Sequence, residues 1–517
     1  MKSNLLFSMV MVMMPLMAHS QTTVSGGLSD FNVQNPDSTL HFTGENSYST
    51  PNSSRLFYGD FRQGFDIEFA MRCDTWGTEQ VFLCKEGRGN EKSADLSVGF
   101  DPMWRKIFAE VKKENGELMR IAAGDKVVMG QWYRVKVRAE YDERRQMTEL
   151  TLSVTGQDNA TAENKVCYEG PALPYNVTPW TIGRGFPGGF PNSLQARDGY
   201  LSGLSVSGRG FARRPGQNPL FTDRFTADPA CMVVGDTIYA YVGEDMASPG
   251  GWFNMPHWLC YSSADMVNWQ AHGPVLRAAD FPNANPGGAW AAQVVKNGDK
   301  YYFYVTLDDK NTGKHMIDVA VGDSPLGPFK PAREDGTPLI TDDMTPDSHR
   351  PNADIDPTVL LDEEGTPWMA WGNGDCYMAR LKRNMIELDG EIRKVPMRDY
   401  SEGPWLFRCG DLYYNVYAAD APGTRPEQIA YAYAPSLEGP WTYGGLLTGP
   451  AKYGFTIHPS IVEFKGKWYF FYHDGSYMKD GEPGGDCRRH VCVEYLRFNE
   501  DGTIRPITLT EQGIAGQ

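Results

Sequence analysis

Residues 457–473 read IHPSIVEFKGKWYFFYH: a short apolar stretch, a turn at a glycine, and then an aromatic stretch. Two such stretches separated by a glycine turn predict a β-hairpin. The pattern returns four more times in the second half of the chain, and self-similarity of this kind predicts a repeat architecture. The other copies are ADPACMVVGDTIYAY at 227–241, AWAAQVVKNGDKYYFY at 289–304, IDPTVLLDEEGTPWMAW at 355–371 and SEGPWLFRCGDLYYNVY at 401–417.

A second hairpin follows the first in three of the copies and ends in SSADMVNW at 262–269, GDSPLGPF at 322–329 and APSLEGPW at 434–441. Two hairpins make a four-stranded sheet, and radial repetition of four-stranded sheets is a β-propeller. The five copies therefore predict a five-bladed β-propeller over residues 222–517. The copies align on one residue at the start of each first strand: Asp228, Trp290, Asp356, Glu402 and His458.

The first half of the chain, residues 21–207, alternates apolar and polar residues in short stretches, which predicts an antiparallel β-sandwich and an all-β fold throughout. The pattern resembles a laminin-G or concanavalin-like lectin sandwich. Two roles stay open for it: binding carbohydrate, or packing against the second domain. Residues 208–221 are rich in Gly, Pro and Arg and predict a linker. The strands expected in the sandwich include 65–71, 132–138, 149–154 and 199–207.

Residues 1–20, MKSNLLFSMVMVMMPLMAHS, combine a lysine, an apolar run and small residues at the end, as a signal peptide does. We therefore expect a protein that is secreted or periplasmic and has no membrane anchor. The net charge of −16 argues against nucleic acid as a partner, because phosphates would be repelled. The nine cysteines are scattered along the chain, which does not predict a disulfide framework or a zinc site.

Three of the five aligned residues are acids: Asp228, Asp356 and Glu402. A single Asp-Pro usually only starts a turn. The innermost strands of a propeller begin near its axis, however, so equivalent residues should meet at one mouth of the central channel. Crowded carboxylates raise one another's pKa. Cleavage of a glycosidic bond needs a set of carboxyl groups of this kind: one acid protonates the leaving oxygen, and one base activates water.

Blade order assigns the roles. Glu402 and Asp228 belong to non-adjacent blades, so a sugar can lie between them, whereas Asp356 neighbours Glu402 and can tune its proton affinity. This makes Glu402 the general acid, Asp228 the general base and Asp356 the modulator. The stretches ADP, IDP and SEGP resemble those of glycoside hydrolase family 43, in which these positions have the same roles. The resemblance implies inversion of the anomeric centre, with the Glu402 and Asp228 carboxyl groups roughly 6.5–9.5 Å apart.

Five further residues are candidates for the site. Trp290 is either a stacking wall for a sugar or a core tryptophan, and Trp252 and Phe253 lie in a Gly/Pro-rich loop that can line the rim. Arg489 is similar to the family's last-blade arginine that reaches the sugar; otherwise it is a surface residue. The same resemblance implies that His458 helps to bind a structural Ca²⁺ in the channel through water; otherwise it is a hydrogen-bonded channel histidine. No cofactor is required.

The sequence thus predicts a glycoside hydrolase that cleaves terminal pentose, α-L-arabinofuranosyl or β-xylosyl, from plant polysaccharide or oligosaccharide. Exo action is expected because the long insertion at 246–257 can wall off one end of the channel. The alternatives are an endo-arabinanase or a galactosidase of the same family, or a non-catalytic carbohydrate-binding propeller. A fructan-cleaving propeller is disfavoured, because its usual Asn-Asp-Pro and Glu-Cys motifs do not occur at the matching positions.

Overall fold

The structure is a computed structural model that describes residues 23–88, 91–124, 126–186, 196–211, 213–333, 335–350, 353–420 and 425–515. The predicted signal peptide, residues 1–20, lies outside the described residues. Within them no helix is long and apolar enough to cross a membrane. The helical elements of this part of the chain are three short 3-10 turns: η1 (Leu28–Asp30), η2 (Ala278–Asp280) and η3 (Asp342–Met344).

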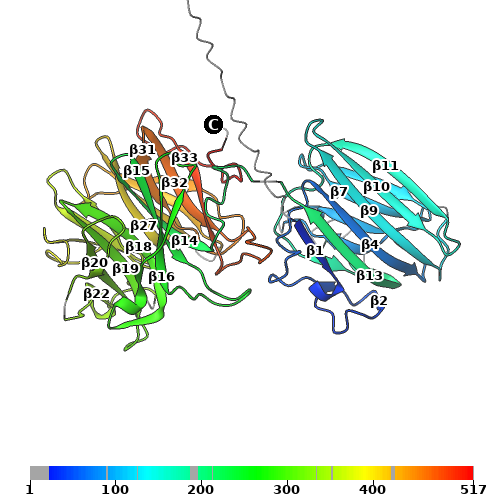
Figure 1. Ribbon diagram of the computed structural model, residues 1–517, viewed down its shortest axis with the longest axis horizontal. Coiled ribbons are helices and arrows are strands. Elements are labelled where there is room, and N and C mark those ends of the chain that lie inside the picture. The colour runs from blue at the N-terminus through cyan, green and yellow to red at the C-terminus, as the bar shows by residue number, and fades with distance from the viewer. Residues whose placement is uncertain are drawn as a thin grey trace, which may run out of the picture.

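The chain forms two β bodies side by side in Figure 1, the first drawn in blue to cyan with β13 in green, and the second in green to red. The first is a sandwich of a seven-stranded and a six-stranded antiparallel sheet that share one apolar core. The first sheet contains β1 (Thr23–Gly27), β2 (Leu40–Thr43), β4 (Gly64–Cys73), β9 (Trp132–Asp142), β10 (Met147–Thr155), β11 (Thr161–Glu169) and β13 (Arg197–Arg209). The second contains β3 (Tyr48–Ser49), β5 (Gln80–Lys85), β6 (Leu96–Asp101), β7 (Lys106–Lys112), β8 (Leu118–Ala123) and β12 (Trp180–Ile182).

All four predicted sandwich strands are confirmed, as parts of β4, β9, β10 and β13. The segment 208–221, predicted as a linker, differs at both ends. It begins inside β13, and at its other end Phe221 is 3% exposed and stacks on Tyr261 of the first blade with ring centroids 3.9 Å apart. The connection between the two bodies is therefore packed against the propeller.

The second body consists of five separate antiparallel sheets that follow one another along the chain, as a five-bladed propeller requires. Blade 1 contains β14 (Thr226–Val234), β15 (Thr237–Glu244), β16 (His257–Ser263) and β17 (Gln270–Arg277). Blade 2 contains β18 (Ala284–Asn297), β19 (Lys300–Asp309), β20 (His315–Gly322), β21 (Lys330–Pro331) and β22 (Ile340–Thr341). Blade 3 contains β23 (Thr358–Leu361), β24 (Pro367–Trp371), β25 (Cys376–Arg380) and β26 (Arg393–Val395). Blade 4 contains β27 (Tyr400–Cys409), β28 (Leu412–Ala419), β29 (Gln428–Ala434) and β30 (Thr442–Thr448), and blade 5 contains β31 (Ser460–Phe464), β32 (Lys467–Asp474) and β33 (His490–Leu496).

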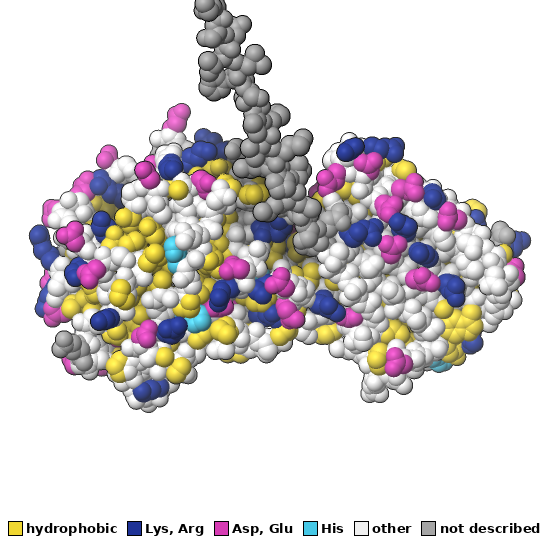
Figure 2. Space-filling view, viewed as in Figure 1, with side chains coloured by type: hydrophobic (Ala, Val, Ile, Leu, Met, Phe, Trp, Pro, Cys, Tyr) yellow, Lys and Arg dark blue, Asp and Glu magenta, His cyan; other side chains and the backbone are white. Residues whose placement is uncertain are grey.

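Blade 5 has three strands where four were predicted. The segment that leads into blade 1 lies along β33, the last strand of blade 5. The Leu220 N–H donates to the Val491 carbonyl, and the Thr226 N–H donates to the Arg489 carbonyl, each at 2.7 Å. These bonds join the last blade to the start of the first and so close the ring. Acidic and basic side chains are interspersed over both bodies on the face shown in Figure 2.

Candidate active site

The innermost strands of blades 1, 3 and 4 each have, within three residues of their start, a left-handed residue followed by a proline. Asp228, Asp356 and Gly403 have φ angles of 49°, 60° and 59°. A residue before proline prefers extended backbone, so this conformation is strained for the two aspartates, at a cost of about 1–3 kcal/mol each. Such strain persists only where the surrounding structure fixes it, and it is found most often at functional sites.

Cross-blade hydrogen bonds identify the equivalent residues. The Cys231 N–H of blade 1 donates to the Ser460 hydroxyl of blade 5, and the Leu406 N–H of blade 4 donates to the Thr358 hydroxyl of blade 3, each at 3.0 Å. Three residues before these donors, Cys231 and Leu406, lie the left-handed residues Asp228 and Gly403. The positions that surround the channel are Asp228, Ala291, Asp356, Gly403 and His458, which together line a cavity of about 20 Å³.

This register corrects the predicted alignment by one residue in blades 2 and 4. Trp290 and Glu402 each precede the equivalent position, which Ala291 and Gly403 hold. A Cβ atom on Gly403 would lie 3.1 Å from the His458 ring, so this position favours glycine over an acid. Glu402 reaches the centre from one residue earlier, through its longer side chain.

His458 lies at the centre of the site and contacts all three predicted acids. Its Nδ1 is 3.1 Å from Asp228 Oδ1, and its Nε2 is 3.1 Å from Glu402 Oε1 and 3.8 Å from Asp356 Oδ2. Asp356 also accepts the Gly403 N–H at 3.0 Å. The structure therefore brings together the three acids of blades 1, 3 and 4, as the repeat predicted. His458 of blade 5 lies between them.

Opposing effects set the protonation of these groups. Burial alone raises the pKa of Asp228, but Arg489 and His458 outweigh it and hold that pKa well below its ordinary value. Burial likewise raises the pKa of Glu402, yet the hydrogen bond and charge of His458 bring it below the ordinary value. In the absence of substrate both side chains are therefore carboxylates paired with positive charge.

The proton-holding groups of the cluster are His458 and Asp356. Burial lowers the pKa of His458, but the adjacent Asp228 and Asp356 raise it well above the ordinary value, so the ring is an imidazolium. Burial raises the pKa of Asp356 to about 7, with Glu402 and Asp228 adding to the effect against His458. The raised carboxyl pKa expected from crowding thus falls on Asp356.

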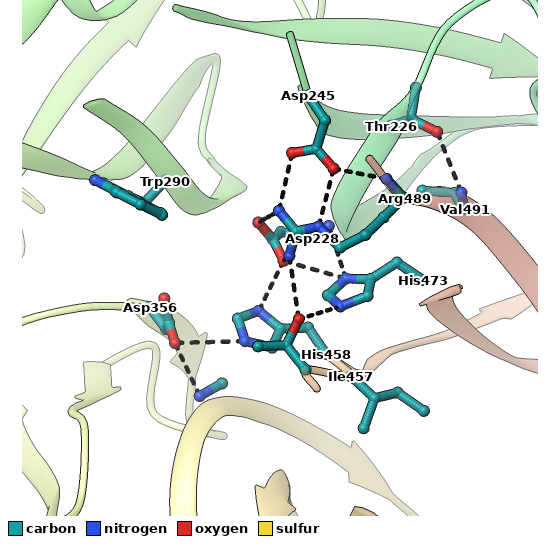
Figure 3. A network of polar contacts seen from close by, with 12 residues as sticks. Thr226, Asp228, Asp245, Trp290, Asp356, Ile457, His458, His473, Arg489 and Val491 are labelled. Carbon is teal, nitrogen blue, oxygen red and sulfur yellow. Dashed lines mark hydrogen bonds and ion pairs between the residues drawn. The ribbon is translucent and has the colours of Figure 1, made fainter. Parts of the chain in front are cut away.

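Arg489 lies between Asp245 and Asp228, as Figure 3 shows. It is 3% exposed. Its Nε and Nη2 donate to the two Asp245 oxygens at 2.9 and 3.0 Å, and its Nη1 and Nη2 donate to Asp228 at 3.2 and 3.4 Å. Arg489 is therefore a buried residue that orients Asp228, and the alternative of a surface arginine is excluded. Its contact with a sugar stays a prediction.

The sequence analysis missed His473, which ends the stretch quoted first. Its Nδ1 accepts the Asp228 N–H at 3.2 Å, and its Nε2 is 3.0 Å from the Thr456 hydroxyl. Burial and the charge of Arg489 lower its pKa to about 4, so the ring is neutral. The sequence feature that could have identified His473 is its place in the repeat. The second strand of each hairpin returns to the channel mouth, and His473 lies near the end of that strand.

Glu427 was also missed, because it lies in the second hairpin of blade 4, outside the aligned positions. It accepts the Ser401 hydroxyl at 2.6 Å and the Ile457 N–H at 3.4 Å. It therefore links the residue before Glu402 to the residue before His458. Burial, followed by the charge of Glu402, raises the pKa of Glu427 to about 8.

The rim of the site carries four aromatic side chains. Trp252 is 72% exposed and stacks with Phe455, with ring centroids 6.4 Å apart. Phe253 packs edge-on against Trp290 at 5.3 Å and against Phe455 at 6.0 Å. Trp290 is half-buried and donates its indole N–H to Asp308 at 2.8 Å. The structure thus joins the three aromatic residues predicted for the pocket into one wall, and adds Phe455 to it.

The expected cation can be tested against the donors at the channel mouth. Asp356, Glu402 and His458 offer ligand atoms within 4.8 Å of one another. Ca²⁺ takes six to eight oxygen ligands, and an imidazolium that donates both N–H groups has no lone pair for a metal. The side chains therefore do not fit direct coordination of Ca²⁺ by His458. A cation held through water stays a prediction.

Comparison with known proteins shows the family of the second body. The family model of glycosyl hydrolases family 43 matches residues 217–504. A xylosidase/arabinosidase of Bacteroides ovatus is 30% identical over 329 residues, covering 54% of this chain and 94% of that protein. Xylosidase/arabinosidase 43A of Humicola insolens is 28% identical over 343 residues, covering 55% and 98%. A GH43_1 enzyme from Xanthomonas citri, solved with xylose, is 29% identical and covers 57% of this chain and 94% of that one, with a TM-score of 0.49.

The matched residues span all five blades, the three acids and Arg489. The sandwich lies outside the match. Because the match covers more than half of the chain, the chain belongs to glycoside hydrolase family 43 and is a glycoside hydrolase.

Proposed function

We propose that this glycoside hydrolase removes terminal pentose, α-L-arabinofuranosyl or β-xylosyl, from plant polysaccharide or oligosaccharide with inversion of configuration. The observation that carries the proposal is the convergence of Asp228, Asp356 and Glu402 on His458 at one channel mouth. The pentose is supported by the relatives' names, xylosidase/arabinosidase in two cases and beta-xylosidase in Xylanibacter ruminicola. We also propose export of the chain, on the basis of its predicted signal peptide.

Asp228 is the general base of the proposed mechanism. Arg489 and His458 keep it ionised, so that it can take a proton from the attacking water. His458 separates Asp228 from Glu402 by the width of its ring and a 3.1 Å contact on each side. This spacing supports an inverting pair, which needs about 6.5–9.5 Å to admit water, over a retaining pair at about 5–5.5 Å.

Glu402 is the general acid. His458 donates a hydrogen bond to it, so a proton can pass from Nε2 to Oε1 over 3.1 Å as Glu402 protonates the leaving oxygen. Asp356 keeps one more proton close to this pair below about pH 7 and fixes the backbone after Glu402 by accepting the Gly403 N–H. The same carboxyl can therefore modulate and orient the acid.

The test of this function is a panel of nitrophenyl glycosides together with linear arabinan and xylan. The proposal expects cleavage of the α-L-arabinofuranoside or the β-xyloside, monomeric pentose as the first product of the polymers, and an inverted anomer by NMR. Release of only long oligomers would contradict exo action. Glycan binding without cleavage would show a binding propeller instead.

The pH dependence of kcat/KM should report on Asp356. Burial makes the protonated form dominate below about pH 7, so we expect kcat/KM of the unmodified enzyme to fall as pH rises through that value. In Asp356→Asn the neutral amide does not titrate. The alkaline fall should therefore disappear or move upward, and the maximum should drop about 10–100-fold because the amide changes the hydrogen bond that Gly403 donates to this side chain. An alkaline limb identical in both enzymes would contradict this assignment.

Removal of divalent cations should leave kcat/KM unchanged. His458 already provides a positive charge between the acids, and the cluster supplies no oxygen cage for Ca²⁺. The measurement is activity after dialysis against EDTA, compared with the same sample resupplied with CaCl₂. Activity that is lost and then restored by Ca²⁺ would instead show a functional cation in the channel.

A further inference from the structure

The sandwich contacts loops of the propeller that form the active site. Figure 1 shows two propeller loops, one green and one orange, extending to the first body. Residues 50–58 of the sandwich meet the loop between β30 and β31: the Phe57 and Tyr58 rings lie edge-on to the Tyr453 ring, at 5.8 and 5.4 Å. Tyr58 is 1% exposed, so this contact is part of the folded core. The same loop continues to Phe455 of the rim and to His458.

A second contact involves the loop between β32 and β33. The Tyr175 hydroxyl of the sandwich donates to the Ser476 carbonyl at 2.5 Å, and Met478 packs against the sandwich core. This loop ends at Arg489, which orients the base Asp228. The sandwich therefore holds both loops that deliver polar residues of blade 5 to the site.

A third contact brings the sandwich to the aromatic rim. A Cβ atom on Gly250 would lie 3.8 Å from the Cβ atom of Ser53, so the 50–58 segment and the Trp252 loop are close neighbours. Beside Ser53, Asn52 and Arg55 are exposed, and Asn52 also hydrogen-bonds to Tyr453. The exposed indole of Trp252 thus lies on the same side of the propeller as the polar residues Asn52 and Arg55 of the sandwich.

We infer that the sandwich supplies part of the substrate site, in which Asn52 and Arg55, together with Trp252, bind the neutral carbohydrate chain beyond the bond that is cleaved. Asp228 and Asp356 are buried at the channel mouth, and the Glu402 side chain is 14% exposed, so the proposed reaction takes place at this end of the channel. The rim lies outside it, where the rest of an oligosaccharide must pass. An aromatic face next to a few convergent polar groups is the usual composition of such sites. The inference rests on the proposed function of the same site.

The test compares a long and a short substrate with full-length enzyme. A nitrophenyl pentoside fills the reacting position without a carbohydrate chain beyond it, whereas an arabino- or xylo-oligosaccharide extends over the rim. In Asn52→Ala/Arg55→Ala, kcat/KM for the oligosaccharide should fall about tenfold, and kcat/KM for the nitrophenyl pentoside should stay unchanged. Both replaced side chains are exposed, so the fold should be retained, which circular dichroism checks. Trp252→Ala should lower oligosaccharide cleavage in the same direction.

Trp104→Ala is the matched control. Trp104 is 67% exposed in the turn between β6 and β7 of the sandwich, and its loss should leave oligosaccharide cleavage unchanged. Equal kcat/KM on both substrates in Asn52→Ala/Arg55→Ala would overturn the inference. So would a loss seen only in Trp104→Ala, which would make the sandwich a separate binding module. Failure of the unmodified enzyme to cleave either substrate would instead reject the proposed function.

Discussion

Replacing Glu402 with alanine should lower kcat/KM on an arabino- or xylo-oligosaccharide by about 10²–10⁴-fold, because the leaving sugar oxygen then has no proton donor. The loss should shrink sharply with a dinitrophenyl glycoside, since that leaving group departs without protonation. Binding should persist, because the aromatic rim is intact. Steady-state kinetics on both substrates, with calorimetry for binding, measure the three quantities.

Glu463→Ala is the control for this change. Glu463 is also a glutamate of an innermost strand, β31, but it is exposed on the propeller surface. It should keep full activity on both substrates. Equal losses of Glu402→Ala on the oligosaccharide and the dinitrophenyl glycoside would rule out the acid role, and unchanged turnover would remove Glu402 from the mechanism.

Replacing Asp228 with alanine should be as damaging, about 10²–10⁴-fold in kcat/KM, for a different reason. Here the attacking water loses its base, so an activated leaving group should not rescue the reaction. A small anion that needs no base can do so: azide should restore turnover of the dinitrophenyl glycoside and give a glycosyl azide of inverted configuration. The measurements are rates with and without azide and the anomeric configuration of the product by NMR.

Asp236→Ala provides the comparison for Asp228, because Asp236 is exposed at the turn between β14 and β15 of the same blade. It should behave as the unmodified enzyme and show no response to azide. An azide product of retained configuration would contradict the inverting mechanism. Arg489 keeps its pair with Asp245 when Asp228 is removed, which favours folding of the variant.

The repeat made the three acids predictable, because periodicity alone states which residues meet at a propeller axis. The same reasoning placed Glu402 in the wrong register by one residue, since an alignment follows residue types and not backbone conformation. The left-handed φ of Gly403, and the His458 ring that a side chain there would approach, decide that register. Glu427 and Asp245 were beyond reach, because each acts through partners distant in sequence.

The sequence by itself determined the all-β class, the five-fold repeat and the identity of the acids, because these depend on patterns within one hairpin and their recurrence. Tertiary structure alone decided the state of those acids. The imidazolium of His458 and the guanidinium of Arg489 come from blade 5 and hold Asp228 and Glu402 as carboxylates, while burial leaves the proton on Asp356. The tertiary structure also decided where the sandwich lies, which is against the loops of the site. Contacts between segments that are distant in the chain leave no periodic pattern in a sequence.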